Sequence, residues 1–104
     1  MALDQKVIEE LKAQHGEIHQ LSYAGVDVIV RAPSRAAWKR YRALMADAAR
    51  RADSFEVLLR DCLLHPSLQD LDGILERRPG LAETFGAELV EIAGLGKEAE
   101  KKVL

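Results

Sequence analysis

A chain of 104 residues has room for one domain, because domains cluster near 100–150 residues. Its hydrophobic fraction of 48% and charged fraction of 31% are globular values, which exclude wholesale disorder. The single cysteine, Cys62, excludes an internal disulfide framework and indicates a reducing compartment. The N-terminus lacks the apolar core of a signal peptide, and no apolar stretch approaches the ~20 residues of a membrane span. We therefore expect a cytoplasmic protein that does not enter membranes.

The N-terminal third changes its hydrophobic period once. Apolar residues at helical spacing predict a helix over 3–15, which begins near Asp4 and ends at Gly16. Residues 17–31 then become β-branched around the turn Ala24-Gly25, which predicts a β-hairpin. Because a lone hairpin is marginal in water, we expect it to pack on the helices or to pair with another chain.

The rest of the chain predicts four helices separated by proline and glycine turns. The first is expected over 34–50 with Ser34 as its cap, and the others begin at Asp53 or Ser54, at Ser67 and at Pro79-Gly80. The second of the four is expected to stop at His65-Pro66.

The predicted fold class is α+β, mainly α. An N-terminal helix and a β-hairpin at about 17–31 precede a compact bundle of about four helices. Residues 1–96 form a single small helical domain, and residues 97–104 form a polar tail, either frayed or helical.

Candidate catalytic residues do not form a motif. His15 and His19 are four residues apart, but Gly16 interrupts the helix that would place them on one face. Cys62 lies on an apolar helix face, where a thiol is an inert core residue, and His65 is expected to bond carbonyls at a helix end. No phosphate-binding or nucleophile motif is present. The sequence predicts no enzyme, no catalytic residue, no metal and no cofactor.

Residues 31–51 carry seven basic side chains and one acidic one, whereas the flanking segments are acidic. The basic helix 34–51 could meet phosphate, or its arginines could pair with the acidic helices around 70–91. The net charge of −2 and the pI of about 5.9 argue against a dedicated nucleic-acid binder.

Aromatic and arginine side chains are the commonest anchors of protein interfaces. We therefore take as candidate partner-binding residues Trp38, Tyr41 and Arg42, with Arg35 and Lys39 steering the partner. The alternative is that Trp38 and Tyr41 only pack the long helix on the hairpin.

Four segments together resemble a known family. They are Val30-Arg31-Ala32-Pro33-Ser34-Arg35-Ala36-Ala37-Trp38-Lys39-Arg40-Tyr41, Leu59-Arg60-Asp61-Cys62-Leu63-Leu64-His65-Pro66, Arg78-Pro79-Gly80-Leu81 and Ile92-Ala93-Gly94-Leu95. Their order and spacing over roughly residues 5–95 resemble the small tail assembly chaperones of long-tailed bacteriophages and prophages.

The resemblance implies a chaperone that binds the phage tape measure protein and assists assembly of the tail tube protein without catalysis. It also implies a location in the host bacterial cytoplasm and not in the mature virion. Two other functions stay open: a small nucleic-acid-binding regulator that uses the basic helix, and a generic protein-interaction adaptor. The exposed hairpin edge also leaves a homo-oligomer open.

Overall fold

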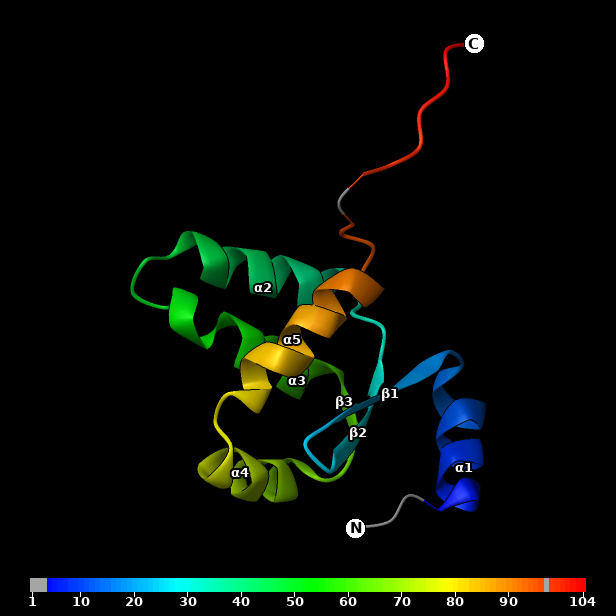
Figure 1. Ribbon diagram of the computed structural model, residues 1–104, viewed down its shortest axis with the longest axis vertical. Helices are drawn as coiled ribbons and strands as arrows, with labels where there is room; N and C mark the ends of the chain where they lie inside the picture. The colour runs from blue at the N-terminus through cyan, green and yellow to red at the C-terminus, as the bar shows by residue number, and fades with distance from the viewer. Residues whose placement is uncertain (1–3, 97) are drawn as a thin grey trace.

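A computed structural model describes residues 4–96 and 98–104 and confirms the α+β, mainly α fold (Figure 1). The described residues contain five α-helices, one short 3₁₀ helix and three strands. In chain order these are α1 (Gln5–His15), β1 (Ile18–Tyr23), β2 (Val26–Arg31), α2 (Arg35–Ala46), η1 (Arg51–Asp53), α3 (Ser54–Cys62), β3 (Leu63–His65), α4 (Leu68–Arg77) and α5 (Leu81–Ile92).

The predicted hairpin is confirmed. β1 and β2 pair antiparallel from Ile18 opposite Arg31 to Tyr23 opposite Val26. The two-residue turn between them holds both Ala24 (φ 54°) and Gly25 (φ 78°) in the left-handed region, which is the backbone of the tight turns that match strand twist.

The sheet has a third strand that the sequence did not predict. β3 pairs antiparallel with β2 at Ile29 and Val30, so β2 is central in the order β1-β2-β3. The residue before a proline is biased toward extended backbone, and the open edge of β2 offers the hydrogen bonds that this extended segment needs. His65 therefore lies in a strand, and the prediction that it bonds carbonyls at a helix end is wrong.

One face of the sheet packs on the helices. Val28 and Val30 are fully buried against α3 and α5, where Leu58, Leu59 and Leu89 are also fully buried. Burial of each such side chain contributes about 1.5–3 kcal/mol. Gly86 lets α3 and α5 approach, because a Cβ built there would lie 2.6 Å from the Cβ of Phe55. The main core therefore lies between this inner face and the helices.

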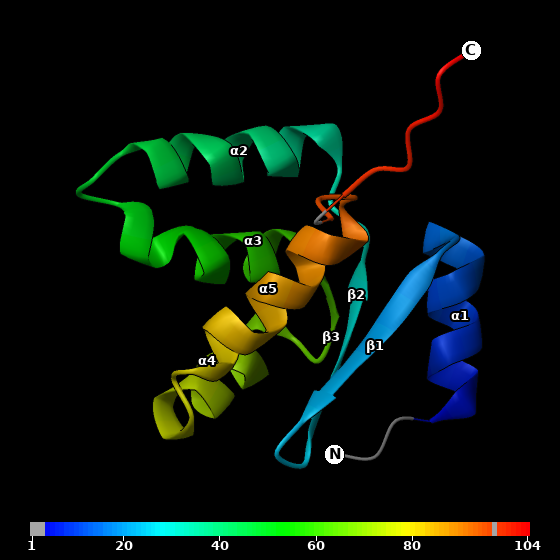
Figure 2. The same ribbon diagram turned by 45° about the horizontal axis from the view of Figure 1, so that its top comes forward.

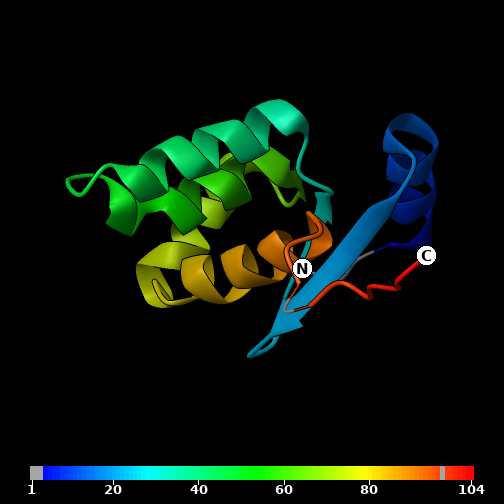
Figure 3. The same cartoon turned by 90° about the horizontal axis from the view of Figure 1, so that it is seen from above.

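The opposite, outer face of the sheet is covered by α1. In Figures 1 and 2, α1 stands on the far side of β1 and β2 from the other four helices, and Figure 3 shows the same separation from above. Asp4 caps α1 by accepting a hydrogen bond from the Lys6 amide, and Gly16 ends it, as predicted. The expected start at Leu3 lies outside the described residues.

The first bundle helix is four residues shorter than predicted. α2 ends at Ala46, and the Asp47 side chain accepts a hydrogen bond from the Ala49 amide, which favours a turn over continued helix. The Arg51 side chain donates to the Met45 carbonyl at 2.7 Å and so satisfies one of the free carbonyls at the helix end. The basic residues Arg50 and Arg51 thus lie in a turn and in η1, off the helix.

α3 stops at Cys62, before the predicted stop at His65-Pro66, because Leu63–His65 join the sheet, whereas α4 and α5 begin where predicted. Ser67 caps α4, Gly80 precedes α5, and Cys62 is buried in the core at the end of α3. Residues 98–104 have no regular secondary structure and are exposed, so the helical alternative for the tail is not adopted there. Within 4–96 and 98–104, no helix is long and apolar enough to cross a membrane.

Candidate functional site

The candidate site begins with the spacing of residues on α2. Ser34 caps this helix by accepting a hydrogen bond from the Ala37 amide at 3.1 Å. The cap fixes the helix register, so Trp38, Tyr41, Arg42 and Met45 lie on one face at positions i, i+3, i+4 and i+7. Three of the five predicted partner-binding residues therefore come together.

The C-terminal end of α5 supplies the other wall. Gly94 adopts φ 104°, and the Leu95 amide donates to the Val90 carbonyl at 3.3 Å, which is the pattern of a glycine-terminated helix end. This turn brings Leu95 to Trp38, Tyr41, Arg42 and Met45, and the five residues line an open cavity of about 360 Å³. We call these five residues the aromatic groove.

The floor of the aromatic groove is built from packed aromatic rings. The ring centroids of Trp38 and Tyr41 are 5.2 Å apart, and those of Tyr41 and Phe55 are 5.8 Å apart. Burial raises the pKa of the Tyr41 phenol, so this ring stays neutral. Tyr41 thus joins α2 to α3 and belongs to the core cluster that also contains Val28 and Val30 of the hairpin, and the aromatic pair also forms one side of the cavity.

The rim of the groove is both apolar and basic. Met45 is 37% exposed and Leu95 is 58% exposed, and the two apolar side chains meet at this one cavity. Arg42 reaches the cavity, whereas Arg35 and Lys39 are exposed on α2 without lining it. Met45 and Leu95 are the two lining residues that sequence reasoning missed.

The basic residues of α2 are mostly free to meet a partner. Arg40 lies 3.4 Å from Asp61 of α3, and the described residues contain no ion pair for Arg35, Lys39 or Arg42. The alternative in which arginines of this helix pair with the acidic helices around 70–91 is therefore not found in the part of the chain that the structure describes. A further arginine–carboxylate pair, Arg60 with Asp72 at 2.6 Å, joins α3 to α4 and holds the pKa of the Asp72 carboxyl below its usual range.

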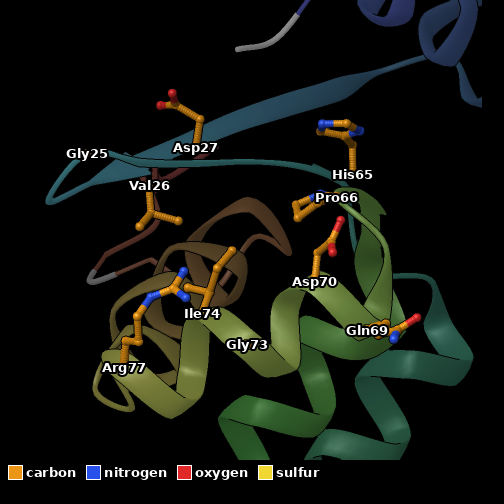
Figure 4. Close-up of a pocket in the computed structure, with 10 residues that line it drawn as sticks. All are labelled: Gly25, Val26, Asp27, His65, Pro66, Gln69, Asp70, Gly73, Ile74 and Arg77. Carbon is orange, nitrogen blue, oxygen red and sulfur yellow. The ribbon is translucent and has the colours of Figure 1, made fainter. Parts of the chain in front are cut away.

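A second and larger hollow lies between the hairpin turn and α4. It has a volume of about 580 Å³ and is bounded by Gly25–Asp27, His65-Pro66 and one face of α4, whose Gly73 leaves open space (Figure 4). In Figure 4 the side chains of Asp27 and His65 point away from α4, whereas Asp70 rises from the helix. Acid–base chemistry requires ionisable groups that converge on one point, and the ionisable groups of this hollow do not.

Two histidines and the cysteine, which the sequence predicts to be unreactive, lie in different elements of the fold. His15 is exposed at the end of α1, and His19 is on β1 with its Nε2 3.0 Å from the Glu17 carboxylate. Burial raises the pKa of the Cys62 thiol to about 11, so the thiol is protonated at neutral pH. Among residues 4–96 and 98–104, no three His, Cys, Asp or Glu side chains are grouped as ligands of a metal ion.

Comparison with known proteins places this fold in a family. The chain belongs to the DUF6848 family, described as a domain of unknown function, whose model matches residues 11–102. It is similar to the solved structure of an uncharacterised protein, rbstp2171, from Bacillus stearothermophilus, with a TM-score of 0.78 and 20% sequence identity. That match covers 91% of this chain and 99% of the other and shows a shared fold. Comparison with curated proteins gives no match.

Proposed function

We propose that this domain binds an amphipathic helix of another protein in the aromatic groove and acts as a chaperone for that helix without catalysis. The observation that carries the proposal is the groove itself, where exposed Met45 and Leu95 stand beside Trp38 and Arg42. Large exposed apolar side chains that cluster mark interaction sites more often than scattered ones do.

The size of the groove favours a helix face. A cavity of about 360 Å³ is near the lower end of the range for ligand sites, and here it is open to solvent. An amphipathic helix fills such a groove with two or three anchors at i, i+3 or i+4, and i+7. Met45 suits this role because a thioether adapts its shape to different partners.

The charge around the groove favours an acidic rim on the client. Arg42 lines the cavity, and Arg35 and Lys39 lie on the same helix without ion pairs in the described residues. Opposite charges at a rim chiefly raise the association rate and set the register of binding. The best client is therefore a helix with an apolar stripe between acidic residues.

The resemblance to phage tail assembly chaperones supplies a specific client, the tape measure protein. That protein is long and helical, so many copies of this domain could cover its apolar stripes and prevent aggregation before the tail tube protein assembles around it. In this proposal the domain acts in the bacterial cytoplasm and leaves before the virion is complete.

The first test is co-expression with the tape measure protein encoded by the same phage or prophage. We expect the client to be soluble and captured only in the presence of this chain. Leu95→Asp should abolish capture, because it places a charge among apolar contacts. Leu68→Asp is the matched control, since Leu68 is 47% exposed on α4 and outside the groove, and it should leave capture intact.

The nucleic-acid alternative predicts a different response to substitution. A duplex DNA probe would bind with steep salt dependence, and Arg35→Glu with Lys39→Glu would remove binding while Leu95→Asp would not. A client that is equally soluble without this chain, with no complex recovered, would overturn the chaperone proposal.

A further inference from the structure

The outer edge of β1 has no backbone partner in the described residues. β1 pairs with β2 on one side, and in the order β1-β2-β3 it ends the sheet. Every second residue of an edge strand directs its N–H and C=O outward, where they can template another strand. Along the six-residue edge from Ile18 to Tyr23, every second residue therefore offers an unpaired N–H and C=O.

Edge strands in natural proteins are usually protected by lysine, proline, a bulge or short length. β1 has none of these, because its sequence is Ile-His-Gln-Leu-Ser-Tyr and its pairing with β2 runs without a register shift. The opposite edge strand, β3, is only three residues long and is followed by Pro66. The two edges of one sheet thus differ, and β1 is the longer and the less protected by its own sequence.

We propose that a second copy of this chain pairs with β1, antiparallel, about a two-fold axis centred on Leu21. A two-fold axis normal to the sheet keeps each side chain on its own face, so facing residues must be an even number of positions apart. Centring on Leu21 sets Tyr23 opposite His19 of the second copy. Tyr23 is 59% exposed in the single chain, and this contact covers it.

The charges at the two ends of β1 are complementary in this arrangement. Glu17 precedes the strand and is exposed, whereas Arg77 and Arg78 lie with Tyr23 and Ala24 around a cavity of about 310 Å³ at its other end. Antiparallel pairing brings Glu17 of each copy to the arginine end of the other. The same attractive contact is made twice, which selects a second copy over an unrelated strand.

One charge opposes the pairing and so makes it testable. Glu88 of α5 lines a cavity of about 270 Å³ beside the middle of β1, together with Gln20, Leu21 and Ser22. Near the two-fold axis, Glu88 approaches its own symmetry mate. Neutralising it should strengthen a symmetric dimer and should have no such effect on a monomer or on a heterologous contact.

The dimer does not depend on the proposed function, because the aromatic groove uses α2 and Leu95 and shares no residue with the β1 edge. The six-stranded sheet that results would carry two grooves. Failure of client binding and failure of dimerisation are therefore separate results.

The experiment is sedimentation equilibrium of the full chain over a wide concentration range, with charge variants. Glu17→Arg should raise the dimer dissociation constant about 3–10-fold, because two exposed ion pairs become repulsive, and Arg77→Glu with Arg78→Glu in the same chain should restore it. Glu88→Gln should lower the dissociation constant. Glu9→Arg, on exposed α1, is the control and should change nothing.

A chain that stays monomeric at every concentration, both as wild type and as Glu88→Gln, overturns the proposal. A dimer that ignores Glu17→Arg and Glu88→Gln also overturns it, because the contact then lies elsewhere. Circular dichroism of each variant shows whether the fold is retained, and these exposed positions are chosen so that it should be.

Discussion

The two faces of the sheet differ in how deeply their side chains are buried, although the central strand β2 contributes to both. On the inner face Val28 and Val30 are fully buried under α3 and α5. On the outer face Ile29 is buried, but its neighbours across the surface are polar, and the Ser22 hydroxyl and Asp27 carboxylate bond to each other there. The covering helix α1 has no buried residue.

The difference indicates which contacts hold the fold together. Free energy from burial scales with the apolar area removed from water, and the inner layer removes far more of it than α1 does. Regions with few buried contacts open locally at lower free energy than the core. We therefore expect the inner layer to be the stable unit and α1 to open at a lower free energy than the rest.

The largest test compares one leucine from each layer. Leu89→Ala on α5 should lower the free energy of unfolding by about 2–5 kcal/mol, because the side chain is fully buried and leaves a cavity. Leu11→Ala on α1 should cost about 1 kcal/mol, because Leu11 is only partly buried. Urea denaturation measures both, and equal losses would show that the two faces contribute alike.

A second test adds a methyl group to each of two helical glycines. Gly86→Ala should destabilise the chain by about 1–3 kcal/mol, since the new Cβ would meet Phe55 across the α3–α5 contact. Gly73→Ala on α4 meets open space and should stabilise the chain by about 0.5–1 kcal/mol through helix propensity. Thermal unfolding of the pair separates packing from propensity, and a neutral Gly86→Ala would contradict the tight contact.

The third test uses pH to probe how far the inner layer is desolvated. Burial raises the pKa of the Cys62 thiol to about 11 from its ordinary 9.0. A folded pKa above the unfolded one means that the stabilisation is complete below pH 9 and is lost as the pH rises toward 11. We expect a loss of roughly 1–2 kcal/mol over that window.

The control for this alkaline loss is Cys62→Ala. The variant should be less stable at neutral pH but should show a shallower decline between pH 9 and 11. A residual decline is expected, because burial also raises the pKa of Tyr41 and acts with the same sign. An unchanged slope in the variant would mean that the thiol is not desolvated.

Most of the fold could be predicted because its signals are local. Asp4, Ser34 and Ser67 cap helices as their sequence positions indicate, and Gly16 ends one. The strand β3 could not be predicted, because three residues after a helix carry no periodicity and its pairing with Ile29 and Val30 is long-range. The early end of α2 depends on Asp47 bonding its own backbone, which competes with a helical pattern.

The sequence likewise predicts one part of the candidate site and not the other. Trp38, Tyr41 and Arg42 share a helix face, so residue type and spacing sufficed to bring them together. Leu95 lies more than fifty residues away in sequence, and only the turn at Gly94 places it beside them. The hydrogen-bonded end of α5 was readable from Gly94, but the helix against which it would lie was not.

The position of Leu95 has a practical consequence. The chain leaves the domain at the rim of the groove, and residues 98–104 extend from there into solvent (Figure 1). A client helix fused after residue 104 through a flexible linker would therefore be tethered at millimolar effective concentration to the surface that is proposed to bind it. Such a fusion would convert a weak encounter between two molecules into intramolecular binding. Leu95→Asp in the fusion should release the client helix from the groove.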